Sequence, residues 1–315
     1  MYNKQYSRGM QEMAYSSYAT DTVRQPEKPL SSLGPYQISG VLGQGGVSIV
    51  YRARRLHQPE VALKVLNMAL AGQPDMRKRF LDEHRLLQQL RHRGIVQVYD
   101  AGELDSRFYI ALQLLTGDTL EALVTRNKTL GEITAVDIAK QTGETLEYIH
   151  SQGLVHRDIK TSNIMITHDR RVILFDFGTV LRLSSLPDEP ITGVFGTPPF
   201  VSPEQALASQ DIDGRSDIYS LGVVLYRMVA GRKPFYGSRS ELLHAHVHEE
   251  PPPPSNFARV SPLLEQIILK ALAKNPDDRF QRAIDMVGAL EEVEPLPEPP
   301  AFSTRLRRWL SLPPA

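Results

Sequence analysis

The sequence contains no cysteine among its 315 residues. This absence excludes disulfide bonds, thiolate metal sites and cysteine nucleophiles, and it fits a reducing compartment. Neither sign of charge is in excess, because Lys plus Arg and Asp plus Glu both number 36, so nothing points to bulk nucleic-acid binding. We therefore expect a cytoplasmic protein without a nucleic-acid partner.

Long hydrophobic runs are also missing. The most apolar stretch, residues 221–230, is interrupted by Arg227 and is too short to span a bilayer, so we expect no transmembrane segment. Residues 1–34 are rich in Ser, Tyr, Gln and Thr, and they lack the basic start and apolar core of a secretion signal. We expect residues 1–34 to form a disordered arm and residues 292–315 to form a Pro-rich, basic tail.

Between these ends, the hydrophobic pattern changes once. Residues 36–71 show short alternating runs split by glycines, which predict a hairpin-rich sheet. The pattern then predicts a helix over residues 75–90 and strands over 95–99 and 108–114.

Beyond Thr119, apolar residues recur at helical spacing. The predicted helices cover residues 133–149, 216–229, 263–272 and 283–290. The sequence therefore predicts an α+β fold over residues 35–291. A small antiparallel sheet lobe with one key helix (35–115) precedes a mainly helical lobe (116–291), and the ligand cleft lies between the two lobes.

Two short segments carry chemistry: HRDIKTSN at residues 156–163 and DFG at 176–178. Phosphoryl transfer from ATP needs the nucleophile, metal ions and phosphates held in line by groups of fixed charge. Asp158 would orient or accept the proton of an acceptor hydroxyl, and Lys160 would neutralise the γ-phosphate. Asn163 and Asp176 supply the oxygen ligands that Mg²⁺, or alternatively Mn²⁺, prefers.

A glycine cluster, Gly43-Gln44-Gly45-Gly46, opens the predicted sheet lobe. Glycine has no Cβ, so the backbone amides of such a turn can approach phosphate oxygens closely. Taken alone, a glycine cluster between two strands is more often only a hairpin turn.

A lysine follows this cluster on the next strand. Period-two alternation places Ala62 and Lys64 on one strand face, with Val61, Leu63 and Val65 on the other. Small Ala62 would leave room for adenine, and Lys64 would point into the cleft. The alternative is a solvated lysine at a strand edge.

Glu83 lies on the apolar face of the helix predicted over residues 75–90. Burying an acid without a counter-charge is expensive, so Glu83 needs a partner, and Lys64 is the obvious candidate. The pair would orient the lysine toward the α- and β-phosphates. The alternative is an exposed glutamate at the edge of the apolar stripe.

Together these residues resemble the eukaryotic-type protein kinase family, over roughly residues 36–290. Further matches lie at residues 196–204, 217–222 and 275–280, and the run 246–280 is most similar to bacterial serine/threonine kinases. The resemblance implies a two-lobed kinase fold with ATP in the cleft. The expected partners are protein substrates with Ser or Thr acceptors and a second copy of the chain, for trans-autophosphorylation.

The resemblance also implies roles for individual residues. The catalytic residues would be Lys64, Glu83, Asp158, Lys160 and Asn163, with Asn163 and Asp176 as metal ligands. The nucleotide-binding residues would be Leu42, Gly43, Gln44, Gly45, Gly46, Val50, Ala62, Lys64, Leu112 as gatekeeper, Gln113 and Leu115.

Three further side chains are given structural roles by the same resemblance. Glu204 is expected to pair with Arg279, and Asp217 is expected to brace the backbone of the loop at residues 156–163. Thr197 stands where serine/threonine kinases bridge the catalytic Asp and Lys, which implies Ser/Thr acceptors.

Regulation is implied by Arg157, which resembles the arginine of kinases that are switched on by phosphate on the activation segment. Thr192 is the first candidate acceptor, followed by Thr179, Ser184 and Ser185.

Two other functions compete with protein phosphorylation. One is a pseudokinase scaffold that binds nucleotide and partners without catalysis, and the other is a small-molecule phosphotransferase of related fold. A metal site at His244, His246 and His248 is not expected, because i, i+2, i+4 spacing does not share one helical face and surface histidines are ordinary.

Overall fold

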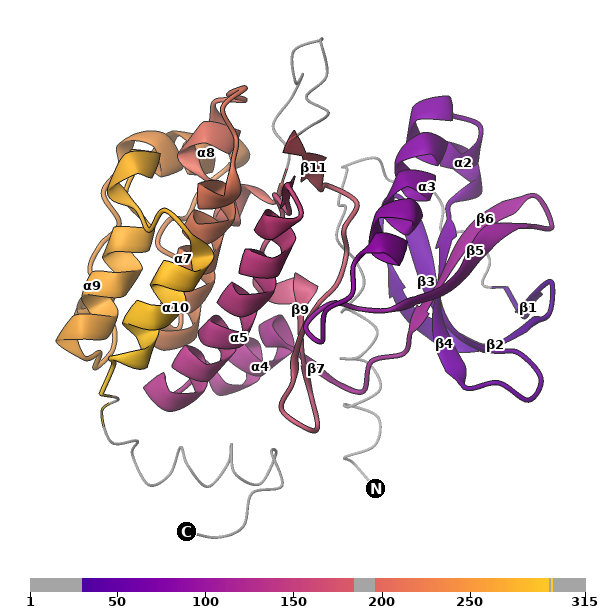
Figure 1. Cartoon of the computed structure of the whole chain (residues 1–315), viewed down its shortest axis with the longest axis horizontal. Coiled ribbons are helices and arrows are strands. Elements are labelled where there is room, and N and C mark those ends of the chain that lie inside the picture. The colour runs from indigo at the N-terminus through magenta and orange to yellow at the C-terminus, as the bar shows by residue number, and fades with distance from the viewer. Residues whose placement is uncertain (1–29, 184–195, 295, 297–315) are drawn as a thin grey trace, which may run out of the picture.

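The computed structural model describes residues 30–183, 196–294 and 296, which form a sheet lobe and a helical lobe (Figure 1). The sheet lobe is a six-stranded antiparallel sheet in the order β1-β2-β3-β4-β6-β5. Its strands are β1 (Ser32–Leu33), β2 (Tyr36–Gln44), β3 (Ser48–Arg54), β4 (Glu60–Leu66), β5 (Val98–Leu104) and β6 (Arg107–Gln113).

The sheet has a different core on each face. The face toward the helical lobe buries Val50, Ala62 and Leu112 in the main core, together with Phe80 of the long helix. The opposite face buries a second cluster that includes Tyr51 and Leu63. The prediction that Ala62 lies on one face of its strand, with Val61, Leu63 and Val65 on the other, is therefore confirmed.

One short and one long helix follow β4, namely α2 (Met68–Ala71) and α3 (Pro74–Gln89). Pro74 suits the first turn of α3 because that turn leaves its N–H groups unpaired, and Asp75 complements the positive end of the helix dipole. Helix α3 buries Phe80, Glu83 and Leu87. It is the key helix expected in this lobe.

The helical lobe is built around α7 (Gly214–Ala230), with α5, α9 and α10 packed about it (Figure 1). Only Gly214, Arg215 and Arg227 of α7 are not buried, as expected for a helix that is apolar on nearly every side. The other helices are α4 (Leu120–Asn127), α5 (Glu132–Ser151), α6 (Pro203–Ala206), α8 (Arg239–His248), α9 (Pro262–Ala271) and α10 (Ala283–Glu291).

Short strands and single 3₁₀ turns frame the segments that carry chemistry. One small sheet has the order β10-β9-β7, and a second pairs β11 with β8. The strands are β7 (Gly117–Thr119), β8 (Leu154–Val155), β9 (Ile164–Thr167), β10 (Val172–Leu174) and β11 (Leu181–Arg182). The 3₁₀ turns are η1 (Thr161–Asn163), η3 (Pro198–Phe200), η4 (Pro254–Asn256) and η5 (Pro276–Asp278).

The structure confirms the predicted α+β fold and its long helices, and it corrects three boundaries. The strand expected over residues 95–99 is wrong, because β5 begins at Val98 and Ile95 makes only one isolated bridge, to Leu174 of the helical lobe. A short apolar run in the sequence is equally compatible with a strand and with a buried linker. The arm expected to be disordered through residue 34 is also too long, because Ser32–Leu33 pair with β2 and Leu33 is buried.

The expected tail likewise begins later than residue 292, because Val293 packs into the core and the N–H of Leu296 donates to the carboxylate of Glu132 at 2.8 Å. Among the described residues, every helix is too short or too polar to cross a bilayer.

Candidate active site

Lys64 of β4 holds together two acids from different parts of the chain. Its Nζ donates to both carboxylate oxygens of Glu83 on α3 at 2.7 Å and to Asp176 Oδ1 at 3.2 Å. Burial alone would lower the pKa of Lys64, but the carboxylates of Glu83 and Asp176 outweigh it and raise the pKa, so the ammonium is retained. The expected Lys64–Glu83 pair is confirmed.

Asp158 lies at the centre of a second buried cluster. Its Oδ1 accepts the Thr197 hydroxyl at 2.8 Å, and its Oδ2 accepts Lys160 Nζ at 2.7 Å. Thr197 Oγ1 also lies 2.7 Å from Lys160 Nζ, so the threonine bridges the acid and the lysine as expected. Burial raises the pKa of Asp158, and the ammonium of Lys160 opposes that rise. A carboxylate with a raised pKa is a better proton acceptor than an exposed one.

The two polar atoms of the Asn163 side chain differ in their hydrogen bonding. Its Nδ2 donates to the backbone oxygen and to Oδ2 of Asp158, both at 3.0 Å. Its Oδ1 is buried and has no hydrogen-bond partner among the described residues. A buried carbonyl oxygen without a partner is costly, and a cation would satisfy it.

Asn163 and Asp176 together therefore offer the hard oxygen ligands of a divalent cation such as Mg²⁺. Both residues line one small cavity of about 20 Å³, which Lys64 and Leu112 also line. The donor set fits the expected metal. No cluster of three or more His, Cys, Asp or Glu side chains suited to a metal occurs in the described part of the chain.

The backbone of this site is held in an unusual conformation. Arg157 and Asp176 both have positive φ, 65° and 68°, which costs free energy in residues other than glycine. Asp217 of α7 accepts the N–H groups of His156 and Arg157, each at 2.8 Å, as expected of its bracing role. Gln205 adds a second brace, because its Nε2 donates to the Arg157 carbonyl at 2.8 Å.

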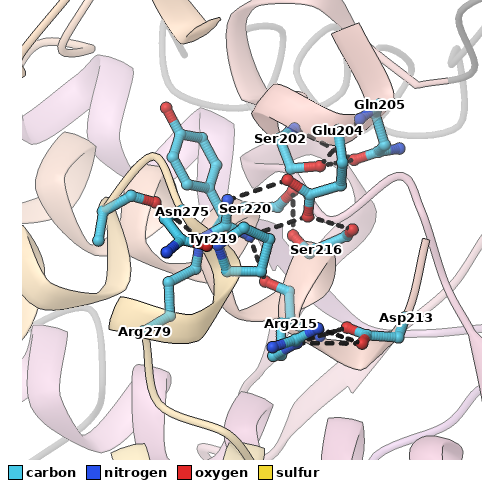
Figure 2. Close-up of polar contacts among 12 residues, drawn as sticks. Ser202, Glu204, Gln205, Asp213, Arg215, Ser216, Tyr219, Ser220, Asn275 and Arg279 are labelled. Carbon is cyan, nitrogen blue, oxygen red and sulfur yellow. Dashed lines mark hydrogen bonds and ion pairs between the residues drawn. The ribbon is translucent and has the colours of Figure 1, made fainter. Parts of the chain in front are cut away.

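A buried ion pair fixes the lobe behind this loop. Figure 2 shows Glu204 and Arg279 facing each other, with Ser216 beside them. The two terminal guanidinium nitrogens of Arg279 donate to the two oxygens of Glu204 at 2.8 and 2.9 Å. Burial would raise the pKa of Glu204, but the hydrogen bonds and charge of Arg279 hold it below its ordinary value. The expected pair is confirmed.

The residues expected to bind nucleotide fall into two groups. Leu42, Val50, Ala62, Leu112 and Leu115 are buried and belong to one core cluster. Within the sheet, Ala62 pairs with Leu112, and Val61 pairs with Gln113.

The glycine-rich segment forms the other group. Gly43 and Gln44 end β2, and Gly45 and Gly46 make the turn into β3, where Gly45 N donates to Ser48 O at 2.9 Å. The segment is a hairpin turn, as its composition alone suggested, and it lies next to the strand that carries Lys64.

A larger cavity of about 740 Å³ opens beside α3. Lys64 and Glu83 line it together with four arginines from three elements: Arg79 and Arg85 of α3, Arg157 of the loop at residues 156–163, and Arg182 of β11. The Nε of Arg157 donates to the Thr179 carbonyl at 2.6 Å, and Arg182 contacts Gln89 at 3.1 Å. The cavity therefore extends from Lys64 to these arginines, which form a basic wall beside α3.

The candidate acceptors for regulatory phosphate divide between described and undescribed residues. Thr179 is buried, and its hydroxyl donates to His156 O at 3.0 Å, so it is a poor acceptor in this conformation. Thr192, Ser184 and Ser185 lie outside the described residues.

The sequence did not single out several residues that contact the site. Gln205 is one, and His150, whose Nε2 lies 2.8 Å from Asp217 Oδ2, is another. Asn67 is a third, because it contacts the glycine turn. These three residues belong to no motif with a distinctive spacing, so their contacts with the site could not be predicted from the sequence.

The expectation that all three α8 histidines lie at the surface is wrong for His246. His246 is 0% exposed, and its Nδ1 lies 2.9 Å from the Tyr219 hydroxyl. His244 and His248 are exposed, and their rings lie 4.7 Å apart. In an α-helix, residues four apart such as His244 and His248 share a face, whereas His246 between them lies on the opposite, buried side.

A sheet lobe over a helical lobe, with Lys64, Asp158 and Asp176 gathered between them, is the architecture of a protein kinase. The family model described as the protein kinase domain matches residues 36–288, so the chain belongs to the protein kinase family.

Two relatives of the chain carry the name of a serine/threonine kinase. The chain is 39% identical over 294 residues to serine/threonine-protein kinase PknB of Mycolicibacterium smegmatis, covering 89% of this chain and 47% of that protein. It is 39% identical over 270 residues to a probable serine/threonine-protein kinase of Streptomyces coelicolor, covering 82% and 40%. The chain thus spans about half the length, or less, of these relatives.

Among solved structures, the chain is similar to the kinase domain of PknI from Mycobacterium tuberculosis, with a TM-score of 0.65 and 28% identity. The match covers 84% of this chain and 99% of that domain.

Proposed function

We propose that the chain transfers the γ-phosphate of ATP, with Mg²⁺, to Ser and Thr hydroxyls of proteins, its own activation segment included. The observation that carries the proposal is the Asp158 cluster. Asp158, Lys160 and Thr197 contact one another at 2.7 to 2.8 Å. Asn163 and Asp176 lie at the same site and offer oxygen ligands.

In this mechanism, Asp158 orients the acceptor hydroxyl and takes its proton. The hydroxyl oxygen forms a bond to the γ-phosphorus, the bond from that phosphorus to the β,γ-bridging oxygen breaks, and ADP leaves. Lys160 neutralises charge on the transferred group. Thr197 holds Asp158 and Lys160 in register by bonding to both.

The small lobe orients the nucleotide. Lys64, held by Glu83, presents an ammonium to the α- and β-phosphates, and the buried wall at Ala62 and Leu112 receives the adenine. Asn163 and Asp176 would hold the metal, which neutralises phosphate charge when bound. A Thr197 hydroxyl placed between Asp158 and Lys160 supports Ser and Thr, rather than Tyr, as acceptors.

Regulation by phosphate on residues 184–195 would use the basic wall beside α3. Arg79, Arg157 and Arg182 converge on one cavity from a helix, the catalytic loop and β11. Phosphate opposite an arginine cluster makes charge-assisted hydrogen bonds that order a segment. Thr192 is the proposed acceptor.

A transfer assay with a panel of acceptors tests the proposal. Labelled ATP is offered to wild type and to Asp158→Asn, with Ser, Thr and Tyr peptides and a panel of metabolites as acceptors. Transfer to Ser and Thr by wild type alone is expected. No transfer at all would favour a pseudokinase, transfer to metabolites only would favour a small-molecule phosphotransferase, and transfer to tyrosine only would reject the assigned acceptors.

The regulatory part has its own test. Phosphatase treatment should lower wild-type activity, and Arg182→Ala should lower activity of the phosphorylated form more than that of the dephosphorylated form. Unchanged activity after phosphatase treatment would remove this part of the proposal.

A further inference from the structure

Asn67, which directly follows β4, contacts the glycine turn at residues 45–47. Its Nδ2 donates to Gly46 O at 2.8 Å and to Gly45 O at 3.2 Å. Its backbone N–H donates to Val47 O at 2.9 Å. One residue therefore binds three successive carbonyls of the turn.

These contacts determine where the amides of the turn point. The described chain contains no cis peptide bond, and in a trans peptide unit the C=O and the N–H point in opposite directions. The carbonyls of Gly45 and Gly46 share their peptide units with the N–H groups of Gly46 and Val47. When Asn67 draws both carbonyls toward itself, both N–H groups must face away from it.

Those two N–H groups are available to a ligand. Neither has a hydrogen-bond partner among the described residues, whereas Gly45 N is already used by Ser48 O. Neighbouring N–H groups gathered in a turn form a concavity that binds anions. Val47 and Ser48 line the cavity of about 740 Å³ that Lys64 also lines, so the turn borders the space in which the lysine ammonium lies.

The side chain of Asn67 has no other evident task, although its backbone carbonyl accepts the first hydrogen bonds of α2. Its side chain makes no capping bond at the start of α2, although it occupies the N-cap position. Its Oδ1 is buried without a hydrogen-bond partner in the described part of the chain, a cost that the two bonds from Nδ2 must offset.

We infer that Asn67 is a positioning residue that holds the glycine turn so that the amides of Gly46 and Val47 bind the phosphates of the nucleotide. This inference rests on the proposed function for the identity of the ligand. It concerns phosphate binding alone, not the transfer step.

The test compares a nucleotide that has phosphates with a nucleoside that has none. Affinities of Asn67→Ala and wild type for the ATP analogue AMPPNP with Mg²⁺, and for adenosine, are measured by calorimetry. Because a protein hydrogen bond contributes modestly, the loss of two should weaken AMPPNP binding by about tenfold and leave adenosine binding unchanged. Equal weakening of both ligands, or of neither, would overturn the inference.

Two further variants keep the test clear. Asn67→Leu has nearly the same shape as asparagine and adds no charge, so it removes the donors even if the alanine variant folds poorly. Asn127→Ala is the matched control, because Asn127 Nδ2 also donates to a backbone carbonyl, Leu123 O at 2.8 Å, within α4. It should bind both ligands as wild type does. Wild type that binds AMPPNP but transfers no phosphate would reject the proposed function and leave the role of Asn67 standing.

Discussion

Lys64 Nζ and the carboxylate of Glu83 lie 2.7 Å apart, although 19 residues separate them in the chain. The lysine is also 3.2 Å from Asp176, which lies 112 residues away in the other lobe. One ammonium therefore contacts two carboxylates, one from each lobe.

Lys64→Met is expected to abolish phosphoryl transfer while the chain stays folded. The variant removes the ammonium that contacts the buried carboxylates of Glu83 and Asp176, so the free energy of unfolding should fall by about 3 to 5 kcal/mol. Urea denaturation followed by circular dichroism measures this loss. Lys64→Met combined with Glu83→Gln should regain part of the stability and none of the activity. Activity retained in Lys64→Met would contradict the role given to the lysine.

Asp158→Asn should lower kcat by about a hundredfold to ten-thousandfold, the usual contribution of a positioned acid or base. The amide keeps the shape of the carboxylate but cannot take the proton of the acceptor hydroxyl. Steady-state kinetics with a Ser or Thr peptide measure the change, and KM for ATP should move little, because the carboxylate faces the acceptor. A normal kcat in this variant would reject Asp158 as the base.

Thr197→Ala removes a hydroxyl that bonds to both Asp158 and Lys160, at 2.8 and 2.7 Å. Since each bond contributes about 1 kcal/mol, kcat/KM for a peptide acceptor should fall by roughly ten- to thirtyfold. Thr197→Ser keeps the hydroxyl and serves as the control, with activity near wild type. Similar losses in both variants would show that the methyl group matters more than the hydroxyl.

Glu204→Gln should destabilise the helical lobe by about 3 to 5 kcal/mol, because it leaves the buried guanidinium of Arg279 without its counter-charge. Arg279 is fully buried at its side chain and Glu204 nearly so, which makes water a poor substitute. Thermal unfolding of the variant measures the loss. The exposed pair Arg93–Glu144 supplies the control, since Glu144→Gln should change stability by less than about 1 kcal/mol.

Stability should fall in mild acid because of His246. Burial, aided by the charge of Lys274, lowers the pKa of His246 to about 4 from an ordinary value of 6.5. Between these values the unfolded chain binds a proton that the folded chain does not, so stability falls as pH drops from about 6.5 to about 4, by about 3 kcal/mol.

His246→Asn keeps an acceptor for the Tyr219 hydroxyl but does not titrate, so it should flatten this part of the pH profile. Urea denaturation at pH 5 and pH 7 checks the difference. Lys274, whose amine donates to the His246 carbonyl at 3.0 Å, stays in place in this variant. His248→Asn, on the exposed face of α8, is the control. An unchanged profile in His246→Asn would reject the effect.

The local pattern was sufficient for much of the site. Alternation along a strand placed Ala62 and Lys64 on the cleft face, because side chains on a strand alternate strictly between its two faces. Helical spacing placed Glu83 on the buried face of α3. The spacing within residues 156–163 and 176–178 named the groups that carry the chemistry, since these residues are close in the chain and one short loop holds most of them.

Other contacts between distant groups appeared only in the tertiary structure. Lys64 contacts Asp176, Gln205 donates to the Arg157 carbonyl, and Asn67 donates to the carbonyls of the glycine turn. Each of these contacts joins segments that no local period connects. The inward turn of His246 likewise depends on what packs against α8. Hydrophobic periods determine which face of an element is buried, whereas the partner of a buried polar group depends on the packing of the whole chain.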